Sequence, residues 1–423
     1  MSSQSPQSIG GVVFRGREWL RGSRYLEIAV FVFIAGFFLA TDTRLHRDIY
    51  YFAVLIPFLS LIDWKSLVLL SETSVFRATI AFIAFLLVTM LWSPNVDIVA
   101  VYDRLRYALL IISFILIVSY LSFRDVAWSD RLTVWLIPVG SVTLILSALM
   151  FYGDGGNFPG DRLENMLFYR ENPLRGSLAF GFLAVLCGAS LIQVRSSKIK
   201  IALVAVGLSV SLIFLLLAQS RGHLLGVAVA MVVTVIACRQ WRLLISLACF
   251  SVLIVAFTQF DAIGIRGFID RGDSHRMELW SATLDQAMTA PWFGQGLNVD
   301  LVFQLENGTA IYSTHNIWLT VFLIGGVCGI IFLLVLVYQA LRGAIIHGKN
   351  CSNWLPLTLL IFGLVHTALN ANQPVHRMDP DFWLALWVPI ALVIAAEARS
   401  RRIGDGGQAE HEGCPKGGVC REC

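Results

Sequence analysis

Three ionisable side chains interrupt an otherwise strongly apolar sequence: Arg221 in AQSRGHLLG, Arg276 in DSHRMELW and His315 in STHNIWL. Ionisable residues at or near membrane depth are costly to keep, so they mark candidate functional positions. Two guanidinium groups that face one chamber can bind a phosphate through paired hydrogen bonds. An imidazole beside them can take a proton from a hydroxyl group. The trio therefore predicts a site that binds a phosphate-bearing substrate and activates a hydroxyl group.

Three further residues are candidates for supporting this site: Gln219, Asn316 and Arg175. Gln219 belongs to the polar cluster around Arg221. Asn316 can either orient the neighbouring histidine or cap the helix that follows it. Arg175 directly precedes a predicted membrane span and is a candidate third phosphate ligand.

Each member of the trio also has a purely structural interpretation. Arg221 could be a snorkelling arginine at a helix end, Arg276 a solvated surface arginine and His315 a capping or interfacial histidine. Asp379 and Asp381 form a D-P-D string that could hold a divalent metal or make a turn and helix cap. We expect the turn, and we expect the site to contain neither a metal nor another cofactor.

The composition is that of an integral membrane protein. Of the 423 residues, 57% are hydrophobic and 14% are charged, whereas soluble domains carry about a quarter charged residues. The mean hydropathy is +0.72. The sequence has no P-loop and no G-x-S-x-G motif, which removes support for phosphoryl transfer from ATP and for serine hydrolysis. We expect an all-α polytopic membrane protein that does not bind nucleic acid.

A helix that crosses a bilayer needs about 20 mostly apolar residues. Twelve segments meet or approach this length: 26–41, 47–62, 75–92, 105–121, 133–151, 176–194, 199–218, 223–238, 241–259, 316–341, 354–371 and 382–397. Only a few polar residues around Arg221 separate the seventh segment from the eighth. That spacing predicts a tight hairpin whose turn lies below the membrane surface.

The distribution of basic residues orients these spans. With the N-terminus in the cytoplasm, 20 of the 32 Lys and Arg residues fall on cytoplasmic segments. The positive-inside rule therefore predicts that both termini are cytoplasmic and that the trio faces the other side. We expect a cytoplasmic N-terminal segment at 1–25, a transmembrane domain at 26–397 and a disordered cytoplasmic tail at 398–423.

The largest outer loop is predicted at residues 260–315 and contains two members of the trio. Within it, residues 274–289 are predicted to form an amphipathic helix with Ser274 as its N-cap. Four apolar side chains recur there at near-helical spacing: Met277, Trp280, Leu284 and Met288. Such a helix would lie along the membrane surface or cover a cavity.

The order of three motifs resembles the O-antigen ligase and O-antigen polymerase superfamily of bacterial envelopes. The motifs are SRGHLLG, then SHRMELW followed by APWFGQGL, then THNIWLTVFLIGGVCGI, and the resemblance is firmest over residues 203–341. It implies a C-type glycosyltransferase-like fold and a glycan donor linked to undecaprenyl diphosphate. It also implies a location in the bacterial inner membrane, with the active site on the periplasmic side.

Carried onto this sequence, the resemblance implies a role for each candidate residue. Arg221 and Arg276, with Arg175, would bind the donor diphosphate, and His315 would activate the acceptor hydroxyl. The implied reaction is a metal-independent transfer that inverts the anomeric carbon. In a ligase the acceptor is a sugar of the lipid A–core, whereas in a polymerase it is another lipid-linked repeat unit.

We favour the ligase over the polymerase because the outer loop before His315 is compact and no second Arg-rich loop of equal length is present. A protein O-oligosaccharyltransferase is expected to carry a larger outer domain. A secondary transporter or flippase for an anionic substrate would predict two comparable halves with paired broken helices. The polar cluster at residues 221–315 has no counterpart in the first half of the sequence, which argues against transport.

Overall fold

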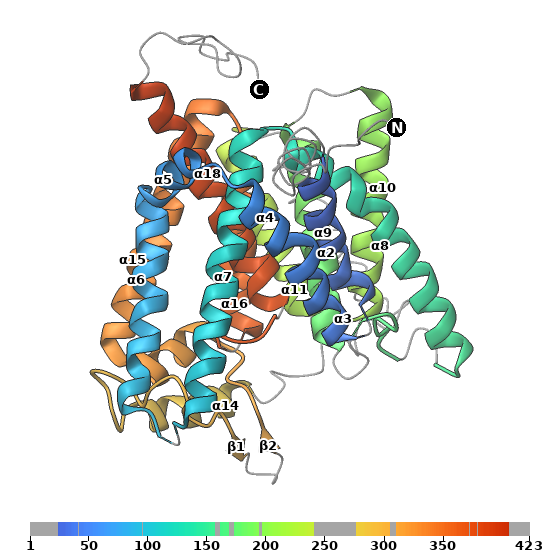
Figure 1. The fold of residues 1–423 in the computed structure, drawn as a ribbon. Helices are drawn as coiled ribbons and strands as arrows, with labels where there is room; N and C mark the ends of the chain where they lie inside the picture. Colours follow the sequence, from blue (N-terminus) through green and yellow to red (C-terminus); the bar gives the residue numbers. More distant parts are fainter. Residues whose placement is uncertain are drawn as a thin grey trace, which may run out of the picture.

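The computed structural model describes residues 24–40, 42–94, 96–156, 161–168, 173–193, 197–240, 276–304, 310–371, 373–378 and 380–405 of the 423-residue chain. Regular structure in these residues is helical apart from one two-stranded hairpin (Figure 1). The predicted all-α class is therefore confirmed. Three predicted features lie outside the described residues: the N-terminal segment up to 23, the ninth span at 241–259 and the tail from 406 onward.

Helices occupy the positions of the first five predicted spans. They are α2 (Tyr25–Leu39), the run of α3 (Thr43–Asp48), η1 (Ile49–Leu55), α4 (Ile56–Leu61) and α5 (Trp64–Ser71), then α6 (Ser74–Val88) with η2 (Thr89–Trp92), α7 (Ile98–Arg124) and α8 (Trp128–Gly153). The second span bends by 101° before α5. At the bend, the carboxylate of Asp63 caps α5 by accepting from the Ser66 amide at 3.3 Å.

Helices also occupy every later predicted span within the described residues. They are α9 (Pro173–Gln193), α10 (Lys198–Leu217), α11 (Arg221–Ala237), α15 (Ile317–Cys351), α16 (Leu355–Asn370) and the run of α17 (Pro380–Phe382), η3 (Trp383–Trp387) and α18 (Val388–Asp405). The last helix continues past the predicted end at 397, where Arg401 pairs with Glu397 one turn earlier at 2.8 Å. Residues 398–405 are therefore helical, although the sequence predicted the tail to begin at 398.

These helices make the chain a multi-pass membrane protein. Seven of the described helices are long and apolar enough to cross a bilayer, or eight if the bent pair before α6 counts as one span. Three more apolar helices are shorter: α2, α11 and α16. Because lipid offers no hydrogen-bond partner, helices of this kind satisfy their backbone groups internally.

The elements of the predicted outer loop gather at one end of the bundle. They are α14 (Arg276–Ala287) and the hairpin of β1 (Phe303–Gln304) and β2 (Ala310–Ile311), in which Phe303 pairs with Ile311. Helix α5 and the C-terminal part of α18 lie at the opposite end (Figure 1). The loop elements and the C-terminal end of the described chain therefore occupy opposite ends of the bundle, and the side of the membrane that each end faces stays a prediction.

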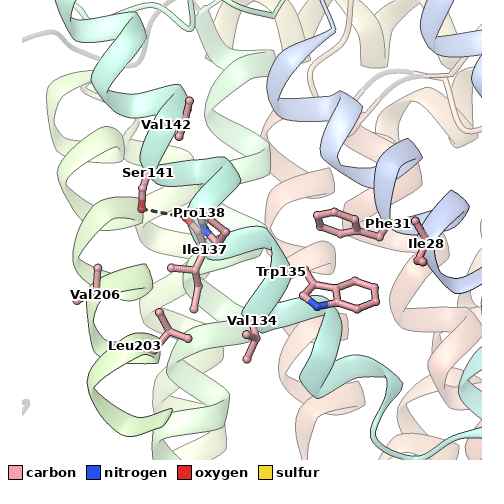
Figure 2. A pocket seen from close by; sticks show the side chains of 10 residues that line it. All are labelled: Ile28, Phe31, Val134, Trp135, Ile137, Pro138, Ser141, Val142, Leu203 and Val206. Atoms are coloured by element: carbon pink, nitrogen blue, oxygen red, sulfur yellow. Dashed lines mark hydrogen bonds between the residues drawn. The ribbon is translucent and has the colours of Figure 1, made fainter. Parts of the chain in front are cut away.

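An apolar groove of about 830 Å³ opens between α2, α8 and α10 (Figure 2). Phe31 and Trp135 form part of its wall, and the Ser141 hydroxyl there donates to the carbonyl of Ile137 in its own helix at 2.9 Å. None of the candidate residues predicted from the sequence lines this groove. The candidate site therefore lies elsewhere, at the α14 end.

Helix α15 is broken near its start, and the loop after α14 forms hydrogen bonds with the backbone groups at the break. Gly326 has φ 60° and ψ −156°, so the helical hydrogen bonds across it cannot form. The amides of Val327 and Cys328 donate instead to the loop carbonyls of Pro291 and Trp292, at 2.8 and 3.2 Å. This exchange satisfies two donors that the break would leave unpaired.

The same exchange satisfies the two carbonyls on the other side of the break. Leu323 and Ile324 are four residues before Val327 and Cys328, so their oxygens lack their usual helical donors. They accept instead from the loop amides of Gln295 and Gly296, both at 2.8 Å. The string APWFGQG is therefore not merely a turn that ends a helix, as the sequence suggested, but a segment docked into α15 by four backbone hydrogen bonds.

We expect Gly326→Ala to destabilise the protein. Its φ lies in the left-handed region, and a Cβ there would lie 2.4 Å from the carbonyl carbon of Trp292. Strain of this kind costs about 1–3 kcal/mol before the steric clash is added. Thermal unfolding of the purified protein in detergent should show a clearly lower melting temperature. Gly153→Ala is the control, because a Cβ at Gly153 meets no atom within 4 Å, and equal melting temperatures for both variants would contradict the prediction.

Candidate functional site

Three separate segments meet at Asn370, the last residue of α16. Its side-chain Oδ1 accepts a hydrogen bond from Nη2 of Arg276 at 2.9 Å. Its main-chain oxygen lies 3.5 Å from Nδ1 of His315. Gly222 packs so closely against its amide that a Cβ would lie 2.7 Å from Asn370 Nδ2, and Gly222 follows Arg221 directly. The structure therefore brings the segments of all three candidate residues to one point.

Arg276 is positioned by the packing of α14 against α15. The buried side of α14 carries Leu279, Thr283 and Ala287, and this helix contacts α15. The indole Nε1 of Trp280 also donates to the main-chain oxygen of Thr314 at 3.2 Å. These contacts fix the helix that carries Arg276 to the segment that carries the candidate histidine.

Three of the four residues of the predicted apolar stripe point away from the protein, whereas the fourth, Trp280, packs against it. Met277, Leu284 and Met288 are all exposed, at 64%, 43% and 58% of their surface. The helix itself is confirmed over residues 276–287, while its predicted N-cap, Ser274, lies outside the described residues. An apolar face left exposed on a helix at the end of a membrane bundle is typical of a helix that lies along the membrane surface.

His315 has an unusual backbone conformation directly before α15. Its φ of 51° lies in the left-handed region, which non-glycine residues seldom adopt. Side-chain hydrogen bonds on both sides hold it there: its own amide donates to Ser313 Oγ at 3.1 Å, and the Thr314 hydroxyl donates to the main-chain oxygen of Asn316 at 3.2 Å. Backbone strain that the surroundings enforce is characteristic of functional positions.

Asn316 is the N-cap of α15. Its side-chain oxygen accepts from the amides of Trp318 and Leu319, at 2.9 and 3.2 Å. Of the two roles that the sequence left open, the structure shows the cap. The capped helix then fixes the position of the preceding His315 through the chain.

The turn before Arg221 joins α10 to α11 through three residues, as the predicted hairpin requires. Gln219 adopts φ 49°, and its amide donates to Leu216 at 3.0 Å, which ends α10. Arg221 is the half-buried first residue of α11. Helix α11 packs chiefly against α16 and α9 rather than against α10, so the hairpin is tight at its turn while its two helices diverge.

Two sequence predictions cannot be placed in this geometry. Arg175 lies in the first turn of α9, but its side chain falls outside the described residues, so its role as a phosphate ligand stays a prediction. Asp379 also lies outside them. Its predicted partner, Asp381, accepts from Nε2 of His366 at 3.1 Å. Within the part of the chain that the structure describes, no three His, Cys, Asp or Glu side chains gather as metal ligands would.

Sequence reasoning found Ser220 and His223 beside Arg221 but missed the residues of α16 that join them in a buried polar cluster beneath the site. His366 is fully buried on α16, and its Nδ1 accepts from Asn370 Nδ2 at 3.4 Å. Its ring stacks on that of His223, with centroids 4.8 Å apart. The Ser220 hydroxyl lies 2.5 Å from His223 Nδ1. One signal was available, because His366 and Asn370 are four residues apart and so share one face of an otherwise apolar helix.

The arrangement can bind an anion beside a group that moves a proton. Arg276 supplies a permanent positive charge, while Asn370 orients the guanidinium without cancelling that charge. His315 Nδ1 lies 3.5 Å from the Asn370 carbonyl oxygen, a contact that favours the tautomer with the proton on Nδ1. Arg276 and His315 both contact Asn370, so one substrate could reach the guanidinium and the imidazole together.

Comparison with known proteins agrees with the family resemblance of the motifs. A family model described as O-antigen ligase matches residues 206–334, a range that contains Arg221, Arg276 and His315. A protein from Pseudomonas aeruginosa named O-antigen ligase is 24% identical over 382 residues, which cover 89% of this chain and 91% of the relative. The family resemblance stated from the sequence motifs is thereby confirmed.

We expect Asn316→Ala to lower the stability of the protein by about 1 kcal/mol, since loss of a side-chain N-cap typically has this cost. Asn316→Asp keeps an oxygen that can accept from both helix amides, so it should unfold close to the wild-type temperature. Thermal unfolding in detergent distinguishes the two. A large loss with Asp as well as Ala would show that capping is not the main role of Asn316.

Proposed function

This chain belongs to the O-antigen ligase superfamily, and we propose that it transfers a polymeric O-antigen glycan from undecaprenyl diphosphate to a sugar of the lipid A–core. The observation that carries the proposal is the meeting of Arg276 and His315 at Asn370. The side chain of Asn370 contacts Arg276, which is expected to bind the diphosphate. Its main-chain oxygen contacts His315, which is expected to accept the proton. The donor and acceptor ends of such a transfer are thereby held next to each other.

The diphosphate gains negative charge as its bond to the glycan C1 breaks. Arg276 and Arg221, with Arg175 as a further candidate, would stabilise that charge, and stabilisation of charge that develops in the transition state is a large source of catalysis. No energy from ATP is required, because the diphosphate linkage supplies it. The polyprenyl tail would lie against the outside of the bundle, within the lipid.

His315 would take the proton from the acceptor hydroxyl as the oxygen attacks C1. With the proton on Nδ1, which lies 3.5 Å from the Asn370 carbonyl oxygen, Nε2 would act as the base. Attack from the face opposite the diphosphate inverts the configuration at C1. The O–H bond of the acceptor breaks, the new C1–O bond forms, and the diphosphate leaves with the electron pair of the old bond.

The arrangement of the bundle supports a location of this site on the periplasmic side of the bacterial inner membrane. α14 and the hairpin lie at the end opposite to the C-terminal part of α18 (Figure 1), and basic residues follow the positive-inside pattern with both termini in the cytoplasm. The exposed apolar face of α14 is suited to the membrane surface at that end. Lipid-linked glycan and lipid A–core would both reach the site from the outer leaflet.

Transfer by the purified protein tests this proposal. Undecaprenyl-diphosphate-linked glycan and rough lipopolysaccharide would be incubated with the protein in the presence of EDTA. We expect glycan on the lipopolysaccharide with the wild type, and a loss of at least about 100-fold for Arg221→Ala, Arg276→Ala and His315→Ala, since loss of one charge-stabilising group costs about 100- to 1,000-fold. The variants would be compared at equal yield of folded protein.

Arg47→Ala is the control, because Arg47 is exposed and pairs with its neighbour Asp48 at 3.3 Å; it should transfer glycan at the wild-type rate. Longer lipid-linked glycan with unmodified lipopolysaccharide would make the protein a polymerase. Activity abolished by EDTA would overturn the metal-independent mechanism. Movement of substrate across sealed vesicles, with no product from either acceptor, would favour a transporter.

A further inference from the structure

A run of hydrogen bonds leads from Arg276 into the interior of the bundle. Arg276 Nη2 donates to Asn370 Oδ1 at 2.9 Å, Asn370 Nδ2 meets His366 Nδ1 at 3.4 Å, and His366 Nε2 meets Asp381 Oδ1 at 3.1 Å. We name these four residues the Asn370 relay. Its members come from α14, α16 and α17, and Asp381 lies 105 positions after Arg276 in the sequence numbering.

Only one assignment of hydrogen-bond donors and acceptors fits the relay. An arginine side chain has donors and no acceptor, so the atom of Asn370 that faces Arg276 must be its oxygen. The amide nitrogen of Asn370 therefore faces His366, and a nitrogen that carries hydrogens needs an acceptor there. His366 Nδ1 must then be unprotonated, and the ring proton must sit on Nε2, where the carboxylate of Asp381 accepts it.

Each orientation in the relay thus depends on its neighbour. A carboxylate only accepts, so Asp381 selects the His366 tautomer whose Nδ1 is free to accept from Asn370. That tautomer in turn selects the Asn370 rotamer whose oxygen faces Arg276. Without Asp381 and His366, the amide of Asn370 could turn over and present hydrogens to the guanidinium.

The relay is buried, which makes these preferences strong. His366 is 0% exposed and Asn370 7% exposed, and the Asp381 side chain is 13% exposed. Little water can replace a misdirected hydrogen bond at such sites, so a wrong orientation leaves polar groups unpaired. The ring of His366 is also held in plane by its stack on His223.

We propose that Asn370 is the positioning residue for the donor arginine of this enzyme, and that His366 and Asp381 fix the amide orientation in which it does so. This inference rests on the proposed function, in which Arg276 binds the donor diphosphate. Asn370 holds Arg276 through its side chain while its main-chain oxygen contacts His315. The relay therefore keeps the two groups at a set separation without touching either substrate.

Binding of undecaprenyl diphosphate to the purified protein tests the inference, with thermal unfolding recorded for every variant. His366→Gln and His366→Met are matched, because both have similar length and both lose the stack on His223. Glutamine keeps one acceptor for Asn370 and one donor for Asp381, whereas methionine keeps neither. We expect the His366→Gln variant to bind undecaprenyl diphosphate within about threefold of the wild type. The His366→Met variant should bind it about tenfold more weakly, because a misoriented Asn370 loses its hydrogen bond to the charged Arg276.

A double-mutant cycle separates positioning from a general structural role. Asn370→Leu has nearly the same shape without the amide, and it should weaken binding about tenfold when Arg276 is present. In the Arg276→Ala background the same change should weaken binding less than about twofold, because the residue that it positions is gone. Equal losses in both backgrounds, or equal losses for Gln and Met at position 366, would overturn the relay.

The result also distinguishes this inference from the proposed function. If Arg276→Ala alone leaves binding of undecaprenyl diphosphate unchanged, then the assignment of the donor site fails and the relay with it. If Arg276→Ala weakens binding while Asn370→Leu and His366→Met do not, then the donor site stands and the relay alone is wrong.

Discussion

The exchange of backbone hydrogen bonds at the break in α15 is the interaction on which the site depends. Bilayer lipid cannot satisfy an unpaired amide or carbonyl, so a broken helix at membrane depth needs partners from the protein. The loop after α14 supplies them in both directions, with Gln295 and Gly296 as donors and Pro291 and Trp292 as acceptors. Because two donors and two acceptors are exchanged together, the loop cannot shift along α15 without losing several hydrogen bonds at once.

This docking determines where Arg276 can be. Helix α14 ends at Ala287, close before the docked string, so its position relative to α15 is largely set by those four hydrogen bonds. The first residues of α15 are fixed independently by the Asn316 cap, and the Trp280 indole ties α14 to Thr314. Arg276 is thus carried by α14 and His315 by the start of α15, and the docked string holds these two helices together. Asn370 on α16 contacts both residues.

The sequence predicted the described spans well and made the trio easy to single out, for a physical reason. Long apolar runs have few alternatives to membrane helices, and an arginine or histidine within them is conspicuous. Asn370 was not conspicuous, because an asparagine at the end of a span looks like an ordinary cap. Its contacts with Arg276 and His315 join positions 94 and 55 residues apart, and no local pattern encodes such pairings.

The break in α15 could have been predicted from the sequence. Gly294 and Gly296 in the loop, and Gly326 in the helix, all adopt positive φ. In each case an added Cβ would collide with backbone of the other segment or of the region after α6. Paired glycine-rich strings in a loop and a nearby span indicate close backbone approach, so the motif could have been interpreted as a docking pair. The exposure of Met277, Leu284 and Met288 could not be predicted in this way, because periodicity shows that a helix has an apolar face but not what covers it.

Arg131 and Arg276, which lie at opposite ends of the bundle, contact different kinds of acceptor. At the α18 end, Arg131 is paired with two carboxylates, Glu27 at 2.5 Å and Asp125 at 2.7 Å, and its hydrogen bond holds the pKa of Asp125 below the ordinary value. Such pairing fixes an arginine but also cancels its charge. Asn370 contacts Arg276 with a neutral oxygen, which orients the guanidinium and adds no negative charge beside it.

A neutral amide has one disadvantage that a carboxylate lacks, because its two ends differ and it can turn over. A site that orients an arginine through an amide must therefore also fix the amide. The carboxylate of Asp381 does this from a distance, since two hydrogen bonds and a histidine ring separate it from Asn370 Oδ1. The negative charge that the structure needs to set the orientation is thereby kept away from the place where a negatively charged substrate would bind.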